Sequence, residues 1–247
     1  MANIVDERGY NQIFATSPAQ TLRLRRRARA IIAALPRRAG TAPARILELG
    51  CGMGEMARLL AEETSARVTG VDLSEKFIVH ARSTHRRPNL DFMIADLTKD
   101  LPAANEEGYD AIAGNGILHH LYHHLDDVLP ALGRWLKPGG RLIFWEPNLW
   151  NPYVYLIFSV PALRQRAKLE PAEMAFTPAF IRRRLQRAGY VNLCVATRDF
   201  LLPNTPTALI RPVVAVSDML DRIPLLNRTA QSLFFTADKP ATGNQLE

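Results

Sequence analysis

Short apolar runs alternate with amphipathic segments through most of this chain, and this pattern predicts strands connected by helices. The predicted strands cover residues 45–49, 67–71, 90–94, 109–113, 141–145, 191–196 and 233–236. Helical periodicity covers 55–63, about 75–82, about 125–136 and 178–188. A strand–helix alternation of this kind predicts a Rossmann-like, doubly wound α/β sheet that is mostly parallel, with right-handed crossovers.

Three regions depart from the alternation. The pattern of residues 1–40 predicts a helical N-terminal extension, and that of residues 238–247 predicts a disordered tail. Two proline-rich apolar inserts cover about 147–176 and 201–230 of a single domain at 41–240. We expect these inserts on the substrate side or at the sheet edge. They could serve as a lid over a hydrophobic small molecule, as a patch that touches a membrane, or as extra core and a homodimer surface.

The net charge of +7 is concentrated in two basic segments. The first holds Arg23, Arg25, Arg26, Arg27, Arg29, Arg37 and Arg38, and the second holds Arg164, Arg166, Lys168, Arg182, Arg183, Arg184 and Arg187. Solvated helix faces are the simpler interpretation, and an anionic substrate, carrier protein, lipid surface or RNA is the alternative.

Cysteine usage and hydropathy bear on location. Cys51 and Cys194 lie in strand-like apolar contexts, so we expect two small buried thiols in a reducing cytoplasm. The sequence shows no signal peptide and no apolar run long enough to span a membrane. The prediction is therefore a cytoplasmic protein, with peripheral contact at the inner face of a membrane as the alternative.

The segment 46–56 carries the clearest chemical signal. An apolar strand ends in Glu48-Leu49, and three glycines follow at alternate positions, Gly50, Gly52 and Gly54. Glycines at such a turn let the backbone approach a ligand closely. An acid beside the loop suits a cofactor with a cationic ammonium and a sulfonium better than it suits a pyrophosphate.

Polar residues also follow the next strands. Asp72 ends the second strand, where a carboxylate can accept hydrogen bonds from ribose hydroxyls. Asp96-Leu97 follows the third strand, and Asn115 with His119-His120 follows the fourth. Ligands of parallel sheets bind at the carboxyl ends of the strands, so we expect these residues to gather at one edge.

These blocks resemble the class I S-adenosylmethionine-dependent methyltransferases of the small-molecule type. The matching segments are 46–56, 68–74, 91–97, 109–121 and 136–146, in that family's order, including Leu136-Lys-Pro-Gly-Gly140. The resemblance implies a seven-stranded sheet whose last strand is antiparallel, and S-adenosylmethionine as cofactor.

The resemblance also assigns roles to the strand ends. The three glycines would contact the methionine part of the cofactor, Glu48 its ammonium group, and Asn115 would lie near the same part. Asp72 would bind the ribose hydroxyls and Leu73 the adenine face. Asp96, with Leu97 beside it, would accept a hydrogen bond from the adenine amino group.

The implied reaction is methyl transfer to a small apolar or amphipathic acceptor, with oxygen as the favoured acceptor atom. If a general base is used, His119, His120 and Glu146 are the catalytic candidates. A metal is not expected. His119/His123 and His120/His124 have helical spacing, but the sequence offers no third ligand.

Other functions remain open at this point. The acceptor could be lipid-like or carrier-bound at a membrane surface. An RNA methyltransferase would explain the arginines, but residues 114–118 lack the motif of enzymes that methylate flipped bases, so nucleic acid is not the expected partner. An NAD(P)-dependent oxidoreductase would require a G-x-G-x-x-G loop, which residue 55 interrupts. The motifs are also compatible with a non-catalytic cofactor-binding protein.

Overall fold

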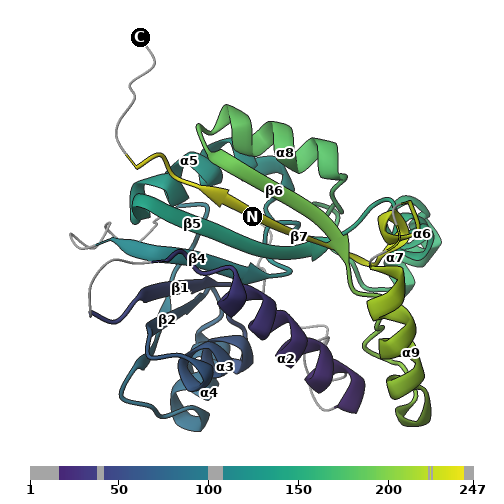
Figure 1. Cartoon of the computed structure of the whole chain (residues 1–247), viewed down its shortest axis with the longest axis horizontal. Coiled ribbons are helices and arrows are strands. Elements are labelled where there is room, and N and C mark those ends of the chain that lie inside the picture. Colours follow the sequence, from purple (N-terminus) through teal and green to yellow (C-terminus); the bar gives the residue numbers. More distant parts are fainter. Residues whose placement is uncertain (1–16, 38–41, 100–107, 222, 224, 242–247) are drawn as a thin grey trace.

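The computed structural model describes residues 17–37, 42–99, 108–221, 223 and 225–241. Its centre is a seven-stranded sheet in the order β3-β2-β1-β4-β5-β7-β6 (Figure 1). The strands are β1 Arg45–Leu49, β2 Arg67–Asp72, β3 Leu90–Ile94, β4 Tyr109–Asn115, β5 Leu136–Pro147, β6 Val191–Arg198 and β7 Ser232–Asp238. Only β7 is antiparallel to its neighbours, which confirms the predicted fold class.

Helices cover both faces of the sheet (Figure 1). One face packs against α2 Pro18–Ala33, α3 Glu55–Glu63 and α4 Glu75–Thr84, and the other against α5 Leu125–Trp135 and α8 Pro178–Arg187. Alternate strand residues face opposite sides, so Leu47 and Leu49 join one core cluster and Ile46 joins the other. The strands are therefore apolar on both faces, as parallel sheets require.

Helix starts follow the capping chemistry of the sequence. Ser17, Ser74 and Thr177 each accept a hydrogen bond from a first-turn backbone N–H. The predicted Thr177-Pro178 start of α8 is confirmed.

The sequence predicts a short strand at 141–145 after a helix that runs to about 136. In the structure β5 already begins at Leu136, which pairs with Tyr109, and the pairing resumes at Ala111 and Arg141. The intervening Lys-Pro-Gly-Gly residues are therefore a bulge inside the strand, where Gly139 has a φ of 73°.

Two further expectations need correction. The predicted tail begins at Asp238, yet this residue is buried at the end of β7 and pairs with Arg141. Residues 242–247 lie outside the described part. Cys51 is buried as expected, but Cys194 is exposed because its strand, β6, is at the edge of the sheet.

The arginine-rich helix α2 also differs from its prediction as a solvated face. Arg25 and Arg29 are exposed, but Arg23 and Arg27 are buried and both pair with Asp199, which follows β6. The two guanidinium groups lower the pKa of Asp199 despite the opposing effect of burial. These two arginines thus join α2 to the end of β6 and are not part of a solvated basic face. Residues 1–16 of the predicted extension are outside the described part.

The two inserts meet at one end of the molecule (Figure 1). The first contains α6 Pro152–Ser159 and α7 Pro161–Arg166, and the second contains α9 Thr207–Leu220, a helix that the proline spacing did not predict. Asn148 is fully buried and its amide donates to the carbonyls of Arg228 and Ala230 at 2.9 and 2.7 Å, joining the two inserts.

Candidate active site

The strand order reverses between β1 and β4. The chain runs outward from β1 to β2 and β3, then returns to place β4 on the other side of β1. In doubly wound sheets, the crevice that binds ligands lies at such a switch point, at the carboxyl ends of the strands. The predicted residues lie at this edge.

The glycine loop has a backbone that other residues adopt poorly. Gly50, Gly52 and Gly54 have φ values of 62°, 53° and 89°. A Cβ at Gly50 would lie 2.6 Å from the Cδ1 atom of Ile117, so β1 and the segment after β4 could not approach as closely. These left-handed positions and the close approach of Ile117 therefore require glycine in this loop.

Glu48 is a buried carboxylate beside this loop. Its side chain is 2% exposed, and burial raises its pKa to about 8. The Oε2 atom is buried and has no hydrogen-bond partner among the described residues. A buried acceptor without a partner is unfavourable, so this position fits a ligand that brings a cationic N–H donor.

Asp72 connects β2 to the loop. Its Oδ2 atom accepts from the backbone N–H of Gly52 at 2.8 Å, and its Oδ1 atom from that of Ser74 at 2.9 Å. Burial raises the pKa of Asp72 against these hydrogen bonds. Leu73 next to it is partly exposed. Asp72 thus lies beside the glycine loop, as predicted.

Asp96 is arranged differently. Its Oδ1 atom accepts from the N–H and hydroxyl of Thr98 at 2.9 and 2.6 Å, and Lys99 is 3.1 Å from Oδ2. These contacts lower its pKa even though burial opposes them. Leu97 packs partly against the core. Asp96 follows β3, as predicted, and its carboxylate is already hydrogen-bonded within its own turn.

Asn115 has a partner that the sequence did not reveal. Its Oδ1 atom accepts from the Nη1 atom of Arg27 at 2.8 Å, and the same guanidinium pairs with Asp199. Helix α2 is therefore tied to the end of β4. The residue separations of 88 and 172 explain why local sequence patterns carry no sign of these contacts.

Glu146, near the carboxyl end of β5, contacts the segment that follows β4. It is 1% exposed, and its Oε1 atom accepts from the backbone N–H groups of Ile117 and Leu118 at 3.0 and 2.7 Å. Its Oε2 atom lies 2.8 Å from the Nδ1 atom of His119. These contacts make Glu146 the residue that fixes the segment after β4 and orients the His119 ring.

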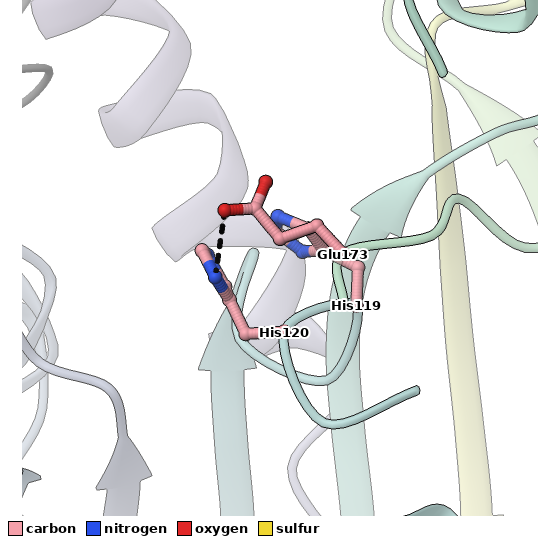
Figure 2. A group of neighbouring side chains, drawn as sticks. All are labelled: His119, His120 and Glu173. Carbon is pink, nitrogen blue, oxygen red and sulfur yellow. Dashed lines mark ion pairs between the residues drawn. The ribbon is translucent and has the colours of Figure 1, made fainter. Parts of the chain in front are cut away.

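The neighbouring His120 faces a different carboxylate. Its Nδ1 atom lies 3.2 Å from Oε1 of Glu173, a residue of the first insert that is 1% exposed (Figure 2). Burial alone would lower the pKa of His120 and raise that of Glu173. Their mutual interaction outweighs burial, raising the former and lowering the latter to about 2. Sequence reasoning missed Glu173 because nothing local relates it to the histidines.

The structure also corrects the proposed histidine pairing. Residues 122–124 form a 3-10 turn, and His123 and His124 are exposed, so the helical pairs His119/His123 and His120/His124 do not form. The expectation that no third ligand exists is wrong, because Glu173 joins His119 and His120 in a cluster able to hold a metal ion.

A separate hollow of about 330 Å³ opens at the amino ends of β1, β2 and β3, lined among others by Arg45, Arg67 and Asn89. It lies at the opposite edge of the sheet from the glycine loop. Ligands of such sheets bind at the carboxyl edge, so we assign the hollow no role in the active site.

Comparison with known proteins agrees with this arrangement. Residues 46–140 match the family described as a methyltransferase domain. Trans-aconitate 2-methyltransferase of Streptomyces avermitilis is 40% identical over 111 residues, covering 43% of this chain and 40% of that protein. Fatty-acid O-methyltransferase of Mycolicibacterium smegmatis is 36% identical over 103 residues, covering 41% and 36%. The chain thus spans about two fifths of the length of these curated relatives.

A solved structure extends the likeness in fold. The S-adenosylmethionine-dependent methyltransferase from Archaeoglobus fulgidus has a TM-score of 0.64 and 18% identity, covering 93% of this chain and 98% of its own. The strand order, the glycine loop and the sequence matches lead to one assignment. The sequence matches identify residues 46–140 of this chain as a methyltransferase domain, and its fold is that of an S-adenosylmethionine-dependent methyltransferase of known structure.

Proposed function

We propose that this protein transfers a methyl group from S-adenosylmethionine to a small apolar or amphipathic acceptor. The observation that carries the proposal is the buried, unpartnered Oε2 atom of Glu48 beside the three glycines. When bound, S-adenosylmethionine supplies an electrophilic methyl group on a sulfonium. The protein then has to align the acceptor with that group and exclude water.

The cofactor would be held by residues from several strand ends. Glu48 would accept from the ammonium group, and Gly50, Gly52 and Gly54 would contact the methionine part, with Asn115 nearby. Asp72 would bind the ribose hydroxyls, and Leu73 would cover the adenine face. Asp96 would accept from the adenine amino group after one of its oxygens gives up its contact with Thr98 or Lys99. Leu97 would line the same pocket.

The acceptor side would use the histidines after β4. In the protein without a bound metal ion, His120, which faces Glu173, would take the proton from a hydroxyl acceptor, and His119 is oriented by Glu146. Glu146 already accepts three backbone N–H groups, so we assign it a positioning role.

The names of the relatives favour oxygen as the acceptor atom. Two of them are a trans-aconitate 2-methyltransferase and a fatty-acid O-methyltransferase, whose names specify small acceptors. The matched residues cover less than half of each relative, so the acceptor-binding inserts of this chain can select a different molecule.

Titration calorimetry with S-adenosylhomocysteine tests this function. We expect one site per chain and a loss of affinity of about tenfold to a hundredfold in Asp72→Ala, as for a lost charged hydrogen bond. No binding, or binding that the substitution leaves unchanged, would refute the assignment of the site.

A lipid-like acceptor at a membrane surface is the second candidate. In the described part of the chain, most exposed large apolar side chains lie in the inserts. They are Trp150, Tyr153, Tyr155, Leu156 and Val160 in the first insert and Leu209, Val216, Met219, Ile223, Leu225 and Leu226 in the second. We call this set the apolar surface. Exposed apolar side chains concentrated in two inserts are typical of a contact site, and the Arg228 guanidinium lies 5.8 Å from the centroid of the Trp150 ring.

No described helix combines the length and the apolar character needed to cross a bilayer. The second candidate therefore predicts peripheral contact, at the inner face of a membrane if the protein is cytoplasmic. Sedimentation with anionic vesicles at low salt tests this idea. Binding that falls as salt rises supports a charged lipid surface, and a protein that stays in the supernatant contradicts it.

A further inference from the structure

Two imidazoles and one buried carboxylate converge at the acceptor side of the crevice. His119 and His120 follow β4, whereas Glu173 comes from the segment between α7 and α8. One donor atom from each residue lies within 4.8 Å of the others, and the two rings have centroids 4.2 Å apart (Figure 2). Chain segments more than 50 residues apart therefore present nitrogen and oxygen donors to one small volume.

The protein orients these donors before any ligand arrives. The Nδ1 atom of His119 faces Glu146 at 2.8 Å, which leaves its Nε2 atom as the donor toward the cluster. A ligating histidine typically has this arrangement, with its second nitrogen bound to a carboxylate that fixes the ring. Glu146 is itself held by three backbone N–H groups.

The segment that carries Glu173 is also fixed. The Arg164 guanidinium donates to the carbonyls of Glu170 and Glu173 at 2.7 and 3.1 Å. The backbone N–H of Met174 donates to the carbonyl of His119 at 3.2 Å, joining the two segments of the cluster directly. The buried Nδ1 atom of His120 lies near Glu173 but makes no well-aligned hydrogen bond with described residues.

We propose that His119, His120 and Glu173 form a binding site for a divalent transition-metal ion. Two imidazole nitrogens and one carboxylate oxygen suit zinc, manganese or iron, and three protein ligands leave further coordination positions open. Ligands of one such ion lie roughly 3–4 Å apart, so the ion would draw these donors together by about an ångström. Its charge would also offset the buried carboxylates of Glu146 and Glu173.

The position of the cluster suggests a role for the ion in binding the acceptor. His120 interacts electrostatically with Asp72, so the cluster lies close to the predicted cofactor pocket. An open coordination position there would hold an oxygen of the acceptor, and this consequence rests on the proposed methyl transfer. Metal binding itself does not depend on it.

Zinc and manganese titrations of the chelator-treated protein test the site. We expect one ion per chain, by calorimetry and by elemental analysis after gel filtration. His120→Ala and Glu173→Gln should each weaken binding at least tenfold. His123→Ala is the matched control, because this exposed histidine lies three residues from His120 and outside the cluster. It should leave the affinity unchanged.

A readout without variants covers the case in which a substitution prevents folding. Cobalt added to the wild-type protein should give visible absorption bands of a low-coordinate nitrogen–oxygen site, and zinc should displace them. No stoichiometric binding of these ions, or binding that survives both cluster substitutions, would show that the cluster is only a pair of histidine–glutamate contacts. S-adenosylhomocysteine binding, measured in chelator, reports separately on the proposed function.

Discussion

The glycine-loop edge and the acceptor side of the crevice are assembled in different ways. The loop, Glu48 and Asp72 come from a short stretch of chain. Glu48 lies near the end of β1, and Asp72 ends β2. The acceptor side joins His119 and His120 to Glu173 across a long separation, as the buried ion pairs join α2 to Asp199. The glycine-loop edge is therefore a local structure that proteins with different acceptors can share. The acceptor side depends on inserts and buried ion pairs, so its specificity and its stability are linked.

Removing the charge of Asp199 should have the largest effect on stability, because it leaves Arg23 and Arg27 buried without their carboxylate. Breaking a buried pair from one side typically costs about 3–5 kcal/mol, so we expect Asp199→Asn to lose stability on that scale in urea unfolding. Asp218→Asn, which breaks the exposed pair with Arg26, should cost no more than about 1 kcal/mol. Equal losses in the two variants would show that burial does not distinguish these pairs.

At the glycine-loop edge, Glu48→Gln should have opposite effects on cofactor binding and on the stability of the fold. Losing a charged acceptor for the ammonium group should weaken S-adenosylhomocysteine binding by about tenfold to a hundredfold. The free protein should become more stable than wild type at pH 8, because the folded state no longer has to bury an ionised carboxylate. Calorimetric titration and thermal unfolding measure the two effects, and a variant that loses both affinity and stability would contradict this role.

The pH dependence of Glu48 has a definite sign. Its folded pKa of about 8 exceeds the ordinary value of 4.5, so the folded state binds an extra proton between these pH values. The free energy of unfolding should therefore fall as pH rises from 4.5 to 8, and this dependence should be absent in Glu48→Gln. Urea titrations of both proteins across this range check the difference in slope.

Cofactor binding should also release a proton near pH 7. Glu48 is mainly protonated there, and a bound ammonium group favours its ionised form. Calorimetry in buffers of different ionisation enthalpy should detect a release approaching one proton, which Glu48→Gln removes. A release that persists in the variant would assign the proton to another group.

The smallest effect on stability is expected at the apolar surface. Tyr153 and Leu156 are 52% and 48% exposed, so Tyr153→Ser with Leu156→Ser should change the free energy of unfolding by only about 0.5 kcal/mol each. Vesicle association should nevertheless fall if this surface contacts lipid. The same pair of substitutions at the buried Val154 and Phe158 should destabilise the fold strongly, which provides the matched contrast.

The sequence by itself determined the alternating strands, the capped helix α8 and the residues at the strand ends. These features are local: hydrophobic periodicity sets which face is buried, and three glycines permit a left-handed turn. The single antiparallel strand and the cofactor came from the resemblance to a family, which itself rests on such local motifs.

Only the tertiary structure decided what the charged residues do. The sequence shows Arg23 and Arg27 on a basic helix, but their burial depends on Asp199, which lies more than 170 residues away. Glu173 likewise meets His120 through tertiary contacts: Arg164 fixes the segment of Glu173 within the first insert, and the N–H of Met174 joins that segment to the carbonyl of His119. A charged side chain has no preferred periodicity that reveals its partner, since that partner is chosen by packing and desolvation in the folded chain.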